Sequence, residues 1–172
     1  EGCSSLKQII IPSSVTEISE GSFSGCSSLT QIVIPSSVTK IKEGSFSGCS
    51  SLMQITGASS VISIGNHAFK ECFSLIQIEF PSLISIGNYS FERCSSLTQI
   101  SIPSSINSIG KGAFLGCSSF KEISIPSSIK SIEMQTFKEC SSLTEIFIPF
   151  SITFIADYAF SGCLTLSTII IP

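Results

Sequence analysis

The sequence predicts a β-solenoid, a coil of short parallel strands that forms a single domain over residues 1–172. Eight cysteines follow one another at intervals of 23, 23, 23, 22, 23, 23 and 23 residues. An isoleucine stands six residues after every cysteine, and a proline stands nine residues after seven of the eight. A period of this length that keeps apolar residues in phase is typical of a solenoid, because each repeat covers the next. We therefore expect seven to eight repeats of 23 residues.

Each repeat is expected to contain two short extended segments joined by turns. The pattern L-x-x-I-x-I at 97–102 predicts a strand with alternate inward side chains, and Pro103 ends it because proline cannot donate to a ladder. A Ser-Ser turn follows the proline, and the pattern V-x-x-I at 38–41 predicts a second, shorter strand. The segment before each cysteine, such as 44–48, is too short for a full helix and favours a helical or 3₁₀ turn.

Two columns of residues run along the predicted coil, one of cysteine and one of phenylalanine. Cysteines in the same phase lie one strand spacing apart, which leaves their Cβ atoms about 5 Å apart instead of the roughly 3.8 Å that a disulfide prefers. A straight column also lacks the converging ligands of a zinc site. We expect buried free thiols that act as small apolar groups and weak donors to the turn backbone, and we expect no metal or other cofactor.

Two neighbouring repeats depart from the pattern. Gly57 and Ala58 replace the inward apolar residue and the proline of the other repeats, and the next repeat has Phe80 at the inward position. That repeat is also one residue short, within the turn at 81–83. We expect a local change of twist at this turn and no domain boundary.

Composition narrows the possible partners. Nine basic residues against 12 acidic ones give a net charge of -3, which argues against nucleic-acid binding. No apolar run approaches the roughly 18 residues that cross a bilayer, so we expect no membrane insertion. The first residues lack the charged and apolar regions of a signal peptide, and there is no initiator methionine, which favours a processed product or part of a longer array.

Function is expected in the outward positions, which vary between repeats. Outward glutamines at one strand position have two interpretations: a ladder of hydrogen-bonded amides along the sheet, or a polar floor for a partner. We favour the ladder for the glutamines, whereas exposed apolar residues at the ends of the same sheet are less easily explained as scaffold and keep the second interpretation open. The candidate binding residues are Gln31, Val33, Gln54, Gln77, Glu79, Gln99, Glu122, Glu145, Phe147, Phe150 and Phe154.

Glu122 and Glu145 share one column on adjacent predicted strands, with carboxylates about 5 Å apart. Retaining glycosidases use such a separation, but nothing nearby suggests a cleft that would perturb a pKa. An inert solvated pair, or a contact to a cation or a basic partner, remains open. His67 is the only histidine and lacks the partners of a hydrolytic triad, so we predict no catalytic residues.

Phe147, Phe150 and Phe154 lie within eight residues, where most repeats have polar residues. All three cannot follow the core pattern, so we expect a patch that is covered by a further repeat, a cap or another copy of the chain. Both ends of the sequence also lack the polar caps that terminal repeats normally carry, which permits self-association.

The repeat unit resembles a known family. The segment 97–117, "LTQISIPSSINSIGKGAFLGC", follows nearly letter for letter the pattern of BspA-like leucine-rich repeats, also called the Treponema pallidum type. The resemblance implies a right-handed leucine-rich repeat solenoid with strands on a concave face, as in bacterial and protozoan surface proteins associated with adhesion. It therefore implies a non-enzymatic module at the cell surface or secreted, which binds a protein or glycan. The alternative is a structural protein that assembles through its ends and the phenylalanine patch.

Overall fold

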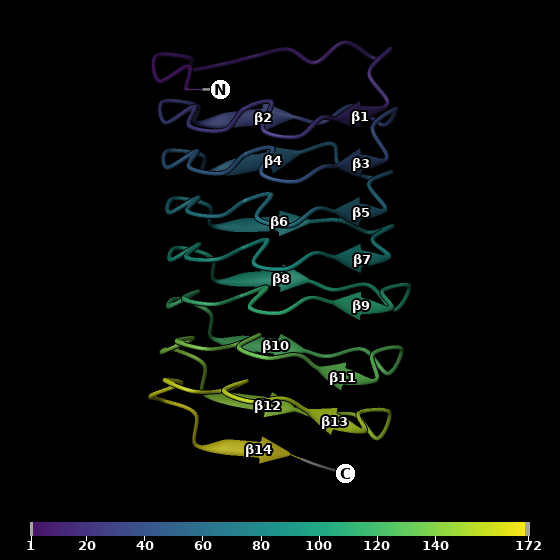
Figure 1. Ribbon diagram of the computed structural model, residues 1–172, viewed down its shortest axis with the longest axis vertical. Helices are drawn as coiled ribbons and strands as arrows, with labels where there is room; N and C mark the ends of the chain where they lie inside the picture. Colours follow the sequence, from purple (N-terminus) through teal and green to yellow (C-terminus); the bar gives the residue numbers. More distant parts are fainter. Residues whose placement is uncertain (1, 171–172) are drawn as a thin grey trace.

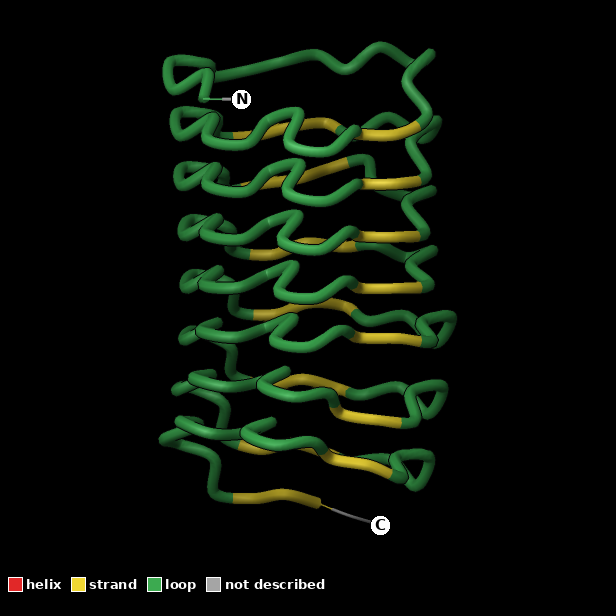
Figure 2. The backbone as a smooth tube through the Cα atoms, in the orientation of Figure 1, coloured by secondary structure: helices red, strands yellow, loops and turns green. Residues whose placement is uncertain are grey.

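The computed structural model describes residues 2–170, and these residues wind into a stack of similar turns (Figure 1). Each complete turn carries one strand of three residues and one of two, on different sides of the coil, and loops connect them (Figure 2). Neighbouring strands pair in parallel, as predicted. The described residues contain no helix.

The three-residue strands form a surface that we call the main face, and the two-residue strands form the second face. The main face contains β2 (Gln31–Val33), β4 (Gln54–Thr56), β6 (Gln77–Glu79), β8 (Gln99–Ser101), β10 (Glu122–Ser124), β12 (Glu145–Phe147) and β14 (Thr168–Ile170). The second face contains β1 (Glu17–Ile18), β3 (Lys40–Ile41), β5 (Ser63–Ile64), β7 (Ser85–Ile86), β9 (Ser108–Ile109), β11 (Ser131–Ile132) and β13 (Phe154–Ile155).

The core lies between these faces and is built from the residues that repeat. On β2, for example, Ile32 is buried while Gln31 and Val33 are exposed, which is the alternation expected of a strand with one covered face. Leu29 and Ile34 extend the same inward row and are fully buried. The predicted parallel solenoid is therefore confirmed, and β2, β4, β6, β10 and β12 alternate between exposed and buried positions as expected. At the C-terminal end, the inward Ile155 and Ile169 are exposed.

Cysteine and phenylalanine together form a continuous corner of the coil. The Cys94 thiol donates a hydrogen bond to the carbonyl oxygen of Phe69, with a sulfur-to-oxygen distance of 3.1 Å. Cys49, Cys72, Cys117, Cys140 and Cys163 make the equivalent bond. The phenylalanine rings stack from Phe23 to Phe160, with centroids 5.2 to 5.7 Å apart. All the cysteines are free, and the predicted column of buried thiols that donate to the turn backbone is confirmed from Cys49 to Cys140. At the two ends of the column Cys3 is exposed and Cys163 is half-buried.

The segment before each cysteine differs from the helical or 3₁₀ turn that the sequence favoured. The Ser24 N–H donates within its own turn to the Gly21 carbonyl at 3.0 Å, whereas the neighbouring Phe23 N–H donates to Ser45 of the next turn at 2.8 Å. Along this segment, one N–H group bonds within its own turn of the coil and the next bonds to the following turn of the coil. A 3₁₀ helix needs consecutive internal bonds, so the stacking of the coil replaces it with a bent, hydrogen-bonded turn.

Both sheets are interrupted at the same level of the stack. Hydrogen-bonded pairing runs from β2 to β8 and resumes from β10 to β14, and on the second face it runs from β1 to β9 and resumes from β11 to β13. Figure 1 shows the wider spacing between β9 and β11. We call this junction, which separates β8 from β10 on the main face and β9 from β11 on the second face, the seam. At the adjacent junctions the Thr98 and Thr144 N–H groups donate to the preceding turn at 3.0 and 3.3 Å, but within residues 2–170 Lys121 has no such bond.

The corner continues across the seam. The Phe114 N–H donates to the Thr136 carbonyl at 3.0 Å, and the Gly116 N–H donates to Lys138 at 2.8 Å. The rings of Phe114 and Phe137 remain stacked, with centroids 5.7 Å apart. The two halves of the coil are therefore joined at the corner while their strands separate.

An aromatic residue in an aliphatic column accounts for the seam. Phe120 stands where the other repeats have leucine, it is fully buried, and its ring centroid lies 5.6 Å from that of Phe114. A larger side chain in a packed core displaces its neighbours, and here the neighbour that moves is the start of β10. Phe80 is a second such residue, and it adjoins the junction where β4 and β6 pair only at Gln54 and Gln77.

The short repeat at 81–83 does not interrupt the sheets. All three residues of β6 pair with β8 across it, and β5 pairs with β7. The expected irregularity at this turn is therefore absorbed in the loop, and the larger break occurs one turn later.

Replacing Phe120 with leucine is expected to close the seam, because leucine fits the column and allows β8 and β10 to pair. A crystal structure of the Phe120→Leu variant should show the Lys121 N–H bonded to the Thr98 carbonyl. The reverse change, Leu143→Phe, should separate β10 from β12 in the same way. Unchanged strand separation in Phe120→Leu would contradict this explanation.

Stability is expected to fall in alkaline solution because of the thiol column. Burial raises the pKa of the Cys49 thiol from its ordinary value of 9.0 to about 12. A group whose pKa is raised on folding contributes stability that is fully present below its unfolded pKa and is lost as the pH rises toward the folded pKa. Denaturant unfolding from pH 8 to 11 should show that the free energy of unfolding falls above about pH 9. It should fall less steeply with pH in the Cys49→Ala variant than in the unmodified chain. Equal slopes would contradict the assignment.

Candidate functional site

The candidate residues gather on the main face, with two exceptions. Gln31, Gln54, Gln77 and Gln99 lie opposite one another on successive strands and are exposed. The same face carries Val33, Glu79, Glu122, Glu145 and Phe147. The remaining two lie elsewhere, since Phe150 is in the turn after β12 and Phe154 is on β13 of the second face.

The glutamine ladder is not present as hydrogen bonds. The amides are aligned in register, but within residues 2–170 no hydrogen bond joins one glutamine side chain of the main face to the next. The ladder interpretation is therefore wrong for this structure. The aligned amides leave both donors and acceptors directed outward, which a binding surface requires.

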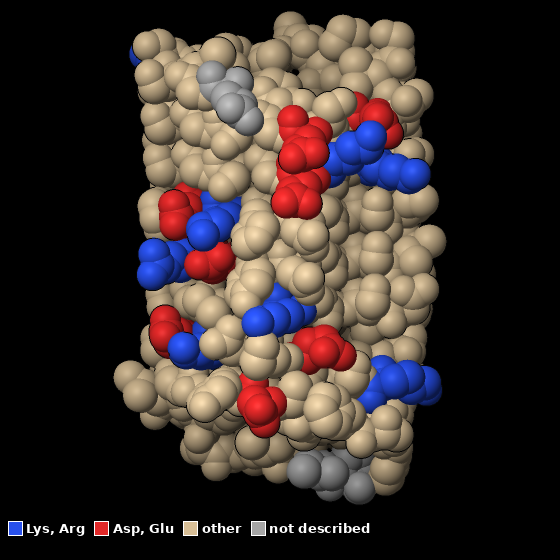
Figure 3. Space-filling model, viewed as in Figure 1, with Lys and Arg blue, Asp and Glu red and all other residues tan. Residues whose placement is uncertain are grey.

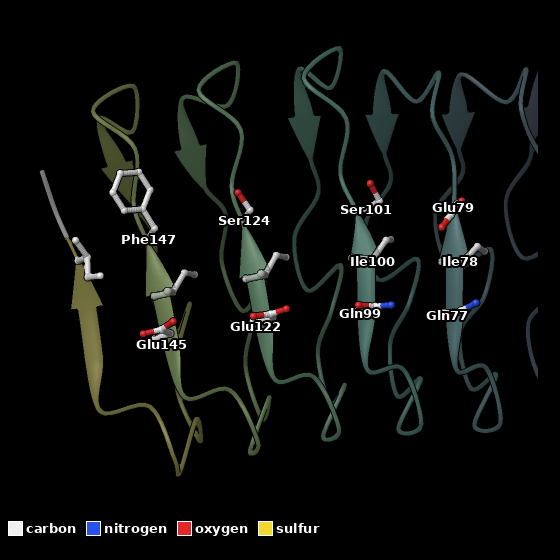
Figure 4. A pocket seen from close by; sticks show the side chains of 13 residues that line it. Gln77, Ile78, Glu79, Gln99, Ile100, Ser101, Glu122, Ser124, Glu145 and Phe147 are labelled. Atoms are coloured by element: carbon white, nitrogen blue, oxygen red, sulfur yellow. The ribbon is translucent and has the colours of Figure 1, made fainter.

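A hollow of about 610 Å³ lies on the main face and extends from β6 to β14. Its floor includes Ile100 of β8 and Ile123 of β10, so it crosses the seam. Figure 4 shows the polar side chains of its lining, including Gln77 and Glu122, rising from neighbouring parallel strands. The structure thus brings most of the candidate residues together around one concave region.

The hollow carries negative charge without compensation. Glu79, Glu122 and Glu145 line it, and in the part of the chain that the structure describes no lysine or arginine does. Glu122 lies directly opposite Glu145 on the paired strands, as predicted. Within residues 2–170 no ion pair involves these carboxylates.

Outside the hollow, several acidic side chains have a basic side chain beside them. On the side of the molecule seen in Figure 3, acidic and basic side chains lie beside one another. Lys42 pairs with Glu17 at 2.6 Å, and Lys70 pairs with Glu92 at 3.3 Å. These carboxylates have a basic neighbour, whereas those of the hollow have none.

The sequence did not predict the hollow, because the seam depends on packing. Ile100 is only partly buried, although the matching isoleucines on β6 and β10 are covered. Ile170 also lines the hollow and was not among the predicted site residues. The one available signal was Phe120, the single exception in a column of leucines.

The described residues contain no group of three or more histidine, cysteine, aspartate or glutamate side chains placed to hold a metal ion. The cysteine thiols are engaged with carbonyl oxygens, and burial raises the pKa of Cys72, Cys94 and Cys117 far above the ordinary range. These thiols are therefore protonated structural groups and poor nucleophiles or metal ligands.

Comparison with known proteins identifies the family. The model of the BspA type leucine rich repeat region matches in six copies over residues 1–85 and 62–172. The chain therefore belongs to the BspA-type leucine-rich repeat family. A search of curated proteins finds no match.

Solved structures support the same assignment. A leucine-rich repeat protein of T. pallidum is 34% identical with a TM-score of 0.84, over 88% of this chain and 72% of that one. One from Bacteroides ovatus is 34% identical with a TM-score of 0.84, over 92% of this chain and 41% of that one. A leucine rich cell surface protein from Faecalibacterium prausnitzii is 29% identical with a TM-score of 0.66, over 92% of this chain and 58% of that one.

The chain thus spans less than two thirds of the length of the last two relatives. In the part of the chain that the structure describes, no helix has the length and apolar character needed to cross a bilayer.

Proposed function

We propose that this chain is a non-enzymatic interaction module of a cell-surface or secreted protein, and that it binds a protein or glycan partner across the main face. The observation that carries the proposal is the hollow of about 610 Å³ on this face. Membership of a leucine-rich repeat family is consistent with a protein-interaction module. The cell-surface relative in F. prausnitzii supports the location.

The physical basis is a rigid array of exposed polar groups. Parallel pairing holds the outward side chains about 4.8 Å apart from strand to strand. Because the backbone is already ordered by folding, binding a partner does not require a further loss of backbone entropy. Amides and carboxylates bind through hydrogen bonds and charge, and neither Gln54 nor Gln77 has a side-chain partner that a ligand would have to displace, among residues 2–170.

Self-association is a second candidate, supported by exposed aromatic residues. Phe147, Phe150 and Phe154 are 47%, 82% and 57% exposed. They follow one turn of the coil from the main face, around the bend, to the second face. Large exposed apolar groups of this kind mark interaction sites in soluble proteins, and a second copy of the chain would cover them.

The main face is tested by placing positive charge in its centre. Gln77→Lys, at a residue that lines the hollow, and Gln54→Lys, on the adjacent strand of the main face, should each abolish or weaken by about tenfold any interaction found with an array of extracellular-matrix proteins and glycans, because each adds a long charged side chain to this face. Ser108→Lys, at an exposed position of the second face, is the matched control. An interaction that survives both main-face changes would contradict the proposal.

The alternative is tested by light scattering after size exclusion. If copies associate through the phenylalanine residues, Phe150→Ser should shift the chain toward monomer, since this side chain is the most exposed of the three. A chain that is already monomeric at high concentration would exclude self-association as the main function.

A further inference from the structure

We propose that the hollow on the main face receives a protein segment that carries lysine or arginine together with an apolar side chain. This inference rests on the proposed function, because it names the chemistry of the partner for the same face.

The charge of the hollow is the first step. Among residues 2–170, the charged residues that line it are Glu79, Glu122 and Glu145. Lys121 precedes Glu122 in the chain, but it does not line the hollow and makes no ion pair with these carboxylates within residues 2–170. Interfaces place opposite potentials against each other, so a concave region with three unpaired carboxylates selects a cationic group.

The arrangement of the carboxylates adds to this preference. Glu122 and Glu145 are direct neighbours across β10 and β12, and like charges in that relation are unfavourable. A cationic side chain placed between them replaces a repulsion with two attractions. Arginine fits this position well, since its guanidinium donates several hydrogen bonds in one plane.

The end of the hollow is apolar. Phe147 and Ile170 line it on β12 and β14, and they are 47% and 45% exposed. An ammonium or guanidinium group alone would leave these surfaces in water. A segment that also carries an apolar side chain, or the methylene stem of a lysine or arginine, would cover them.

The seam favours a peptide over a neutral sugar as the ligand. The facing edges of β8 and β10 are not paired with each other, and both strands line the hollow. Unpaired backbone N–H and C=O groups require partners, and an extended peptide supplies donors and acceptors of the same kind.

The experiment uses the full chain and two labelled peptides of equal length. One contains arginine and leucine, and the other contains glutamate and leucine. Fluorescence anisotropy should show binding of the arginine peptide, weaker at high salt, and little or no binding of the glutamate peptide. The double variant Glu122→Gln/Glu145→Gln should weaken binding of the arginine peptide by roughly threefold to tenfold, as expected for two partly exposed ion pairs.

The control removes the same charge elsewhere. Glu20→Gln/Glu43→Gln changes two exposed carboxylates that lie outside the hollow, near the second face. It should leave the affinity unchanged, and thermal unfolding should confirm that both double variants are folded. Equal losses in the two double variants would show attraction to net charge alone and overturn the proposal. Equal binding of the two peptides, or binding of a neutral polysaccharide in their place, would also overturn it.

Failure of this inference can be distinguished from failure of the proposed function. If Gln77→Lys abolishes an interaction that Glu122→Gln/Glu145→Gln leaves intact, the main face binds a partner that is not cationic. If neither change affects the interaction, the main face itself is not the binding surface.

Discussion

The corner formed by cysteine and phenylalanine is the constraint on which the rest of the coil depends. From Cys49 to Cys163, each thiol bonds to the carbonyl of a phenylalanine that lies 25 or 26 residues earlier, and the rings of those phenylalanines stack along the axis. A repeat of 23 residues satisfies both contacts only when it makes one complete turn. The strands follow from this, since residues at equal distances from successive corners come side by side in register.

The corner also explains how the coil tolerates irregular repeats. A missing residue at 81–83 and the larger Phe120 both change the length or width of a turn, yet the ring stack continues past each of them. The missing residue is absorbed in its loop. The change at Phe120 is transferred to the strands, which separate at the seam. The hollow forms across that separation, so the same packing that holds the coil together also shapes the candidate site.

The repeating residues were sufficient to predict the coil, its strands and its free thiols, because a periodic pattern constrains every turn in the same way. The outward position of Gln31, Glu122 and Phe147 followed from alternation along each strand. The hollow did not follow, since it depends on how a single buried ring at Phe120 is accommodated. The bent turn before each cysteine was not visible in the spacing, because it depends on competing bonds between turns. The absence of a hydrogen-bonded glutamine ladder was not visible either, because strand register aligns the amides without fixing the side-chain torsions that such bonds need.

The central claim, that the corner joins the whole coil while the sheets divide at the seam, is tested most directly by amide hydrogen exchange on the unmodified chain. The N–H groups of Phe91, Phe114 and Phe137, which bond from turn to turn at the corner, should exchange slowly on both sides of the seam and across it. The N–H group of Lys121 should exchange much faster than those of Thr98 and Thr144. Fast exchange at Phe114, or equal protection of Lys121 and its neighbours, would contradict the account.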